Sequence, residues 1–587
     1  MLSASLPLLG RVARNERHGA NSMKLPRHFD SRLRYLARWA RRTIRPDSGL
    51  TLWDDLIRRE GDIWERARLD ASGGPAVMIA TSTGGHAGVM PVESMLAVAL
   101  TLRGADVRIL LCDRVLPACL QATRDDLPSV SSFVRQGPRS LCNSCFRSGM
   151  TTFGSLGLPI LRYSELVTAA DIQEAQAVSE GVPAASIGAY REGNLSVGEH
   201  ALAGALRYFA KGSLDDEPRA EAVLRRYLTA SLLTMRVAGR LLDAGDFVAW
   251  VFHHGIYVPQ GVVGEVARSR GVRVVNWNPA YRKRCFVFSH GDTYHHTLMH
   301  EPASEWENLS WTQATETKLM SYLKSRWKGS QDWIWFHERP KTDEKAIRRE
   351  LGIDSTRPVI GMLTNVVWDA QLHYPANAFP NMIEWAIETI RYFAGRPDLQ
   401  LVIRIHPAEV TGGVPSRQPM AEVIQEIFAQ LPKNVVVIPP QSRISTYAVM
   451  AMCDSVIIYG TKTGVELTSS GTPVIVAGEA WIRNKGISLD VSSQEEYFQL
   501  LSQLPVGKVL DEAVQLRARK YAYHFFFRRM IPLAFMDPQP GWPPYKVAIR
   551  SLKELLPGRD KGLDVVCDGI LNGTSFVYRD ELSTEGA

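Results

Sequence analysis

The sequence contains no stretch of apolar residues long enough to cross a lipid bilayer, although 45% of its 587 residues are hydrophobic. A helix that spans a bilayer needs about 20 consecutive apolar residues. The start of the chain holds only a brief apolar run, and arginines follow it rather than precede it, unlike the order in a secretory signal. These features predict a cytoplasmic protein.

Cysteine is too sparse for a secreted disulfide framework, with seven residues in the whole chain. Four of the seven lie close together in the sequence, and the last two of these form a Cys-x-x-Cys pair. In a reducing compartment, thiols clustered in this way indicate a structural zinc site that pins an insertion. Free or redox-active thiols are the alternative. The candidate metal ligands are Cys112, Cys119, Cys142 and Cys145.

Net positive charge is almost absent from the body of the chain. The formal net charge is +7, but residues 1–47 alone contain eleven Lys and Arg against three Asp and Glu. The remainder is close to neutral, which argues against an extended nucleic-acid surface. Residues 29–44 combine an apolar face with five arginines, as in a basic amphipathic helix that lies on an anionic membrane. A helix packed on the domain with a charged outer face is the alternative.

Internal repeats of solenoid period and low-complexity tracts are also lacking. The length suits two core-forming domains with extensions. Strands and helices alternate in both halves, which is typical of parallel sheets. We therefore predict an α/β fold in four parts: a basic arm and helix (1–70), a first Rossmann-like domain with a cysteine-containing insertion (71–340), a second Rossmann-like domain (341–525), and a C-terminal helix and tail (526–587).

Residues 401–490 carry the clearest pattern. Four short runs, LVIRI, NVVVI, SVIIYG and PVIVAG, have the composition of strands buried on both faces, and a polar loop and a helix follow the third. In parallel sheets, ligands bind at the carboxyl ends of the strands, near helix N-termini. The candidate binding residues at these ends are Arg404, His406, Pro407, Gly460, Thr461, Lys462, Thr463, Gly464 and Glu466.

These residue types suit a nucleotide-sugar. Backbone N–H groups of the loop 461–464 can hold a phosphate, and the Glu466 carboxylate can accept hydrogen bonds from a ribose diol. The departing charge can be stabilised by Arg404, His406 or Lys462. No DxD-like metal cluster is present, so we expect this stabilisation to need no metal.

The first half has a glycine-rich turn, STGGHAG, but neither the GxGxxG spacing nor a Walker lysine. The turn carries His86, and a later strand, FVAWVF, ends in His253 and His254. A transfer reaction needs a base that takes a proton from the acceptor. The candidate catalytic bases are His86, with His254 and Glu93 behind it. A loop histidine without a catalytic role is the alternative.

Three segments resemble a known family: RIHPAE, YGTKTGVEL, and GTPVIVAGEAWIRNKGISLD. They are similar to the capsule polysaccharide biosynthesis family, which includes β-Kdo transferases and shares a His-Pro motif with bacterial sialyltransferases. The resemblance covers about residues 358–525 and implies a GT-B fold, with two domains facing across a cleft. It implies that His406 and Pro407 contact the donor phosphate, beside the loop of Thr461, Thr463 and Gly464. It also matches Glu466 to the carboxylate of the following helix.

We therefore expect a metal-independent, inverting glycosyltransferase of capsular or lipopolysaccharide-type surface polysaccharide biosynthesis. Its first domain would bind a glycan or lipid-linked acceptor, and its second a nucleotide-sugar donor. No cofactor is expected for transfer, and no nucleic-acid partner. Peripheral contact with the inner face of the membrane would follow from residues 29–44. The alternatives are a nucleotide-sugar 2-epimerase of the same fold and a non-catalytic glycan-binding protein of capsule assembly or export.

Overall fold

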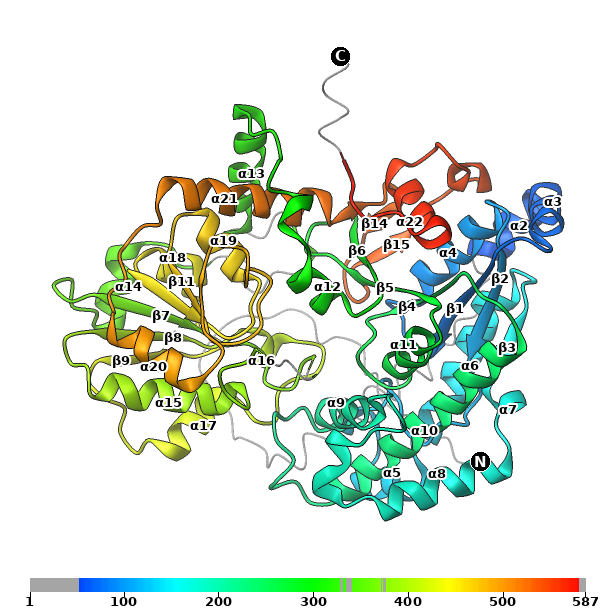
Figure 1. Ribbon diagram of the computed structural model, residues 1–587, viewed down its shortest axis with the longest axis horizontal. Coiled ribbons are helices and arrows are strands. Elements are labelled where there is room, and N and C mark those ends of the chain that lie inside the picture. Colours follow the sequence, from blue (N-terminus) through cyan, green and yellow to red (C-terminus); the bar gives the residue numbers. More distant parts are fainter. Residues whose placement is uncertain (1–51, 328–330, 334–339, 371, 373–375, 580–587) are drawn as a thin grey trace, which may run out of the picture. The chain divides into compact units, whose positions relative to one another are not determined.

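The computed structural model describes residues 52–579, except for 328–330, 334–339, 371 and 373–375. The predicted amphipathic helix at 29–44 lies outside these residues. In the part of the chain that is described, no helix is both long and apolar enough to span a bilayer. Two large sheets form the framework, and helices pack around them (Figure 1).

The first sheet has seven strands in the order β13-β6-β5-β4-β1-β2-β3. Strands β1 to β5 pair in parallel, whereas β6 runs antiparallel to β5 and β13 antiparallel to β6. The order reverses between β1 and β4, so the topological switch point of this sheet lies there. The bounds are β1 (Ala76–Ser82), β2 (Asp106–Leu111), β3 (Ile160–Arg162), β4 (Ala249–His253), β5 (Arg273–Pro279), β6 (Cys285–His290) and β13 (Ile531–Pro532).

The second sheet has six strands, all parallel, in the order β12-β11-β10-β7-β8-β9. Its switch point lies between β7 and β10. The Val- and Ile-rich runs form these strands because both faces of the sheet are covered, and every residue of β7, β8, β10 and β11 is buried. The bounds are β7 (Val359–Leu363), β8 (Gln400–Arg404), β9 (Val435–Ile438), β10 (Ser455–Ile458), β11 (Val474–Val476) and β12 (Leu489–Asp490).

Helices with one apolar face cover both sheets. In α15 (Met382–Ala394), the side chain of Asn381 accepts a hydrogen bond from the backbone N–H of Glu384 and so fixes where the helix begins. The other helices used below are α4 (Met90–Thr101), α6 (Arg139–Gly154), α9 (Val197–Phe209), α10 (Ala220–Ala244), α11 (Gln260–Ser269), α12 (Tyr294–His300), α13 (Gln313–Arg326), α16 (Ala408–Thr411), α18 (Thr446–Ala451), α19 (Thr463–Ser469), α21 (Glu512–Tyr523) and α22 (Lys561–Asn572).

The C-terminal segment returns to the first sheet. Helix α21 continues into a π-helical turn at His524–Arg528, after which β13 adds to the edge of the sheet beside β6. Ile531, Leu563 and Phe576 then pack in the same core as β1 and α4. Residues 526–587 were expected to form a helix and a tail, but 531–577 complete the first α/β layer instead.

Helix α13 lies in the segment predicted to belong to the first domain. Leu319 and Tyr322 pack in a core that includes Val287 of β6 as well as Val359 and Val456 of the second sheet. The predicted α/β class is confirmed: the described residues form two Rossmann-like sheets with helical extensions.

Candidate functional site at the carboxyl ends of the strands

Histidines gather at the switch point of the first sheet. His86 follows β1, and His253 and His254 end or follow β4. The ring centroids of His86 and His253 are 5.2 Å apart, and those of His253 and His254 are 5.3 Å apart. His254 has a φ of 70°, a left-handed conformation that costs free energy in a residue with a side chain. The sheet thus presents three imidazoles where doubly wound folds bind ligands.

Two of these imidazoles are neutral at physiological pH. Burial, with a contribution from Arg207, lowers the pKa of His86 to about 4. Burial, Arg207 and His86 lower the pKa of His254 to about 3. A neutral imidazole with so low a pKa is a weak base, so these two predicted bases suit hydrogen bonding to a ligand better than proton abstraction.

Glu93, the third predicted base, is fully buried on α4. Its carboxylate accepts hydrogen bonds from the Thr81 hydroxyl and, at 3.1 Å, from the Trp277 indole. Burial raises the pKa of Glu93 to about 7. Because its oxygens are bound to β1 and β5, Glu93 ties α4 to these strands, and its role as a base stays a prediction.

The switch point of the second sheet is bridged directly. The Asn365 amide, just beyond β7, donates a 2.9 Å hydrogen bond to the Gly460 carbonyl, just beyond β10. Thr461, Lys462, Thr463 and Gly464 follow, and α19 begins among them. The structure therefore brings the predicted loop 461–464 to the edge of the sheet at its switch point.

His406 also lies at this edge, immediately after β8. Its backbone N–H donates to the Thr364 hydroxyl at 3.2 Å, and its Nδ1 accepts from the Ala408 N–H at 3.1 Å. The neutral ring therefore carries its proton on Nε2. Burial, followed by Lys462 and Arg404, lowers the pKa of His406 to about 4. Pro407 is the residue from which the short helix α16 begins.

Glu466 and Lys462 are bound to each other within the protein. Lys462 Nζ contacts Glu466 Oε1, and Arg326 Nε lies 3.1 Å from Glu466 Oε2. The Lys462 ammonium also lies 4.8 Å from the centroid of the Tyr281 ring. Burial acts to raise the pKa of Glu466, but Arg326 and Lys462 outweigh it and the pKa is lowered. With both oxygens paired to cations, the carboxylate positions the loop, and its contact with a ribose diol stays a prediction.

Arg404 is likewise committed to the protein. It is 1% exposed, and its guanidinium donates to the carbonyls of Pro439 at 2.6 Å and Ser442 at 3.1 Å. Burial lowers its pKa to about 10. Arg404 thus ties β8 to the loop after β9, and its contact with a phosphate stays a prediction.

Asp369 connects the two halves. The Tyr257 hydroxyl, from the loop after β4, donates to Asp369 Oδ1 at 2.9 Å and accepts from the Ala370 N–H at 2.9 Å. Asp369 also interacts electrostatically with His295 of α12 and with His406. Burial and then His254 lower the pKa of His295 to about 3, and Asp369 opposes this. Groups from the carboxyl edges of both sheets therefore belong to one polar cluster.

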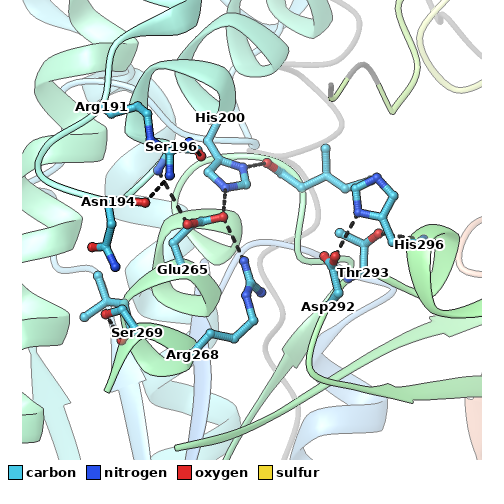
Figure 2. A network of polar contacts seen from close by, with 12 residues as sticks. Arg191, Asn194, Ser196, His200, Glu265, Arg268, Ser269, Asp292, Thr293 and His296 are labelled. Atoms are coloured by element: carbon cyan, nitrogen blue, oxygen red, sulfur yellow. Dashed lines mark hydrogen bonds and ion pairs between the residues drawn. The ribbon is translucent and has the colours of Figure 1, made fainter. Parts of the chain in front are cut away.

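A second histidine of α12 is paired with a carboxylate, as Figure 2 shows. His296 Nδ1 lies 2.9 Å from Asp292 Oδ2, and the Thr293 side chain caps the helix between them. Burial acts to lower the pKa of His296, but Asp292, Glu479 and Glu199 raise it above its usual value. Among the described histidines with a shifted pKa, only His296 shifts upward. Asp292 and His296 stand four positions apart, a spacing that could have indicated the pair.

A neighbouring network in Figure 2 holds the loop that follows His254. His200 of α9 is 2.5 Å from the Ile256 carbonyl through Nδ1 and 3.7 Å from Glu265 through Nε2. Glu265 of α11 also accepts from Arg268 at 2.8 Å. This network joins α9, α11 and the loop after β4, and so fixes the backbone that carries His254.

Several buried polar atoms at the two switch points are unpaired. In the described structure no hydrogen-bond partner lies near Nδ1 of His86 or His253, near either amide atom of Asn276, near Asn365 Oδ1 or near Glu479 Oε2. Buried polar atoms normally have partners, and leaving one unpaired costs about 1–3 kcal/mol. Of these residues, His86, His253 and Asn365 lie at or just beyond the carboxyl ends of β1, β4 and β7, where a polar ligand could meet them.

The sequence matches no protein-family model and no curated protein. Similar solved structures include the β-Kdo 2,4 transferase KpsC of Thermosulfurimonas dismutans, with 12% identity over 47% of this chain and 79% of that one and a TM-score of 0.31. UDP-GlcNAc 2-epimerase of Methanocaldococcus jannaschii is 11% identical over 76% and 98%, with a TM-score of 0.28. The Streptomyces sp. SF2575 glycosyltransferase SsfS6 is 10% identical over 77% and 95%, with a TM-score of 0.23. Function is therefore argued from the site itself.

Proposed function

We propose that this protein is a glycosyltransferase that transfers a sugar from a nucleotide-sugar to a glycan or lipid-linked acceptor. One observation supports this most: unpaired buried polar atoms stand at the switch points of both sheets, and Asp369 links histidines of the two edges electrostatically. A reaction between two polar substrates needs groups from two binding regions at one place.

The donor would bind at the second sheet. Its phosphate would accept hydrogen bonds from His406 Nε2–H and from the loop 461–464, and Asn365 Oδ1 and Glu479 Oε2 would meet its hydroxyl groups. The Arg326–Glu466–Lys462 group would position this loop, and Arg404 would position the loop after β9. Leaving-group stabilisation would come from these donors, without a metal.

The acceptor would bind at the first sheet, with His86 and His254 as hydrogen-bonding groups. His296 is the base that its surroundings favour, because Asp292 stabilises the protonated ring. In a direct displacement, the acceptor oxygen would bond to the anomeric carbon as the bond from that carbon to the phosphate oxygen breaks. The acceptor proton would pass to His296, the electron pair would leave with the nucleotide, and the configuration would invert.

The biological setting is proposed on the sequence resemblance. The acceptor would be a growing surface polysaccharide or its lipid-linked precursor, met at the inner face of the membrane through residues 29–44. Sedimentation of the full chain with anionic and neutral vesicles tests the membrane contact. Replacing Arg38, Arg41 and Arg42 by Gln should abolish sedimentation with anionic vesicles, and equal sedimentation with both vesicle types would exclude the electrostatic contact.

A thermal-shift panel of CMP-, UDP-, GDP- and dTDP-sugars tests the donor. A ligand at 100 times its Kd stabilises the native state by about 2.7 kcal/mol, so the true donor should raise Tm clearly. Incubation of that donor with and without a glycan acceptor then separates three outcomes. Nucleotide release only with acceptor supports transfer, a changed sugar without acceptor indicates a 2-epimerase, and glycan binding without turnover indicates a binding protein.

A further inference from the structure

Four cysteines of the first half lie around the loop that carries His86. Cys112 directly follows β2, Cys119 is in the loop beyond it, and Cys142 and Cys145 are one turn apart on α6. The remaining cysteines, at 285, 453 and 567, are buried singly elsewhere in the cores.

Three hydrogen bonds bring these segments together. The Cys112 N–H donates to the Ser82 carbonyl at 2.8 Å, and the Gly85 N–H donates to Cys145 Sγ at 3.1 Å. Arg114 donates to the Asn143 side chain at 3.1 Å, between the two cysteines of α6. The segment 82–85 therefore lies between Cys112 and Cys145.

Glycines allow this close packing. A Cβ on Gly84 would lie 2.6 Å from Gly149 Cα and 2.7 Å from the Cys145 carbonyl oxygen. A Cβ on Gly137, just before α6, would lie 2.7 Å from the Pro117 carbonyl oxygen, and Pro117 is two residues before Cys119. Gly84 and Gly85 of the glycine-rich turn therefore approach the cysteine-bearing helix α6.

The four thiols also interact electrostatically as one group. Burial, followed by Cys145, Cys142 and Cys112, raises the pKa of Cys119 well above its usual range. Burial, followed by Cys112 and Cys145, raises that of Cys142 to about 12. The thiols of Cys112, Cys142 and Cys145 therefore lie close enough to Cys119 to interact with it.

We propose that Cys112, Cys119, Cys142 and Cys145 are the four thiolate ligands of a metal centre. Four thiolates select soft metals, that is zinc or an iron–sulfur cluster. The Gly85 N–H would then donate to a ligand sulfur, as outer-shell donors do in both kinds of site. The centre would fix the segment 82–85 and, through it, the position of His86.

Among the described residues, no three His, Cys, Asp or Glu side chains are placed to hold a metal ion, so the thiols are not drawn together around one point in this structure. Around one zinc ion the sulfurs would lie about 2.3 Å from the metal. The metal content of the protein distinguishes such a centre from an iron–sulfur cluster.

The test is the metal content of the full chain, purified without oxygen. Iron with acid-labile sulfide, at roughly two to four of each per chain, supports the cluster. One zinc per chain supports the same four ligands around a single ion. Absence of metal after purification, and again after anaerobic incubation with ferrous iron and sulfide or with zinc, overturns the proposal.

Cys142→Ser with Cys145→Ser should lose the metal, and Cys453→Ala, with its cysteine buried in another core, should keep it. If the double variant does not fold, thiol titration of the native protein replaces it. Removing the metal with a chelator should make the four clustered thiols reactive, whereas an unchanged number of reactive thiols would argue against bound metal.

Discussion

The amide of Asn365 donates a 2.9 Å hydrogen bond to the Gly460 carbonyl across the switch point of the second sheet. Its other polar atom, Oδ1, is buried with no partner in the described structure. One side chain thus joins the ends of β7 and β10 and leaves an acceptor for a ligand hydroxyl.

Asn365→Ala should weaken nucleotide-sugar binding about tenfold, because losing one such hydrogen bond costs about 1–1.5 kcal/mol. Calorimetric titration measures the Kd. Gln494→Ala is the matched control, since it removes an exposed amide that bonds to Glu384 away from the site. Equal affinities of the two variants would remove Asn365 from the donor site.

His406→Ala should lower kcat by about 10²- to 10³-fold, the usual loss when one donor to a developing negative charge is removed. Its circular dichroism spectrum should match that of the native protein. The control is His300→Ala, which removes an exposed imidazole at the end of α12. Turnover within a factor of two of the control would contradict the proposed phosphate contact.

The pH dependence of kcat/KM should report His296. Its pKa is raised, and a base works only when deprotonated, so the rate should rise with pH through a value above the ordinary 6.5. Asp292→Asn removes the largest stabilising partner of the protonated ring, while Glu479 and Glu199 remain. In this variant the rise of kcat/KM should therefore move to lower pH, and kcat should fall. If the pH at which kcat/KM rises is unchanged in this variant, the group that titrates is not His296.

Stability should fall in mild acid. The pKa values of His86 and His406 are lowered to about 4 in the folded protein, so the unfolded chain binds protons below about pH 6.5 while the folded one does not. Protonation then favours unfolding as the pH drops from about 6.5 towards 4, by at most about 2 kcal/mol per histidine at pH 5. Urea titrations at pH 7.5 and 5 measure this. The His86→Gln, His406→Gln double variant should lose less stability between the two pH values.

Glu466→Gln should destabilise the protein by about 3–5 kcal/mol, because it leaves two buried cations with a neutral partner. Glu350→Gln is the control: its ion pair with Lys341 is exposed, and its loss should cost under about 1 kcal/mol. Urea denaturation compares the two. Similar costs would mean that the buried group is not held together by charge.

Local sequence pattern was enough to locate the strands of the second sheet, because PVIVAG and SVIIYG can be buried on both faces only in a parallel sheet. The positions of His406 and the loop 461–464 at strand ends follow from the same pattern. Their roles as ligand contacts stay predictions.

Other features depend on segments far apart in the sequence. The partner of Glu466 is Arg326, on a helix expected in the other domain, and the partner of Asp369 is Tyr257. No local spacing indicates such pairs. The return of residues 531–577 to the first sheet escaped prediction for the same reason, since a two-residue strand leaves almost no periodicity.

That return affects how the chain is made. Strand β13 and helix α22 complete the core around β1 and α4, but they are synthesised last. The second sheet has all of its strands by Asp490, and α21 adds to its core soon afterwards. The first sheet lacks its edge strand β13 until the second half has been translated. We therefore expect the edge of β6 and the apolar surface beside it to stay exposed to other chains during synthesis.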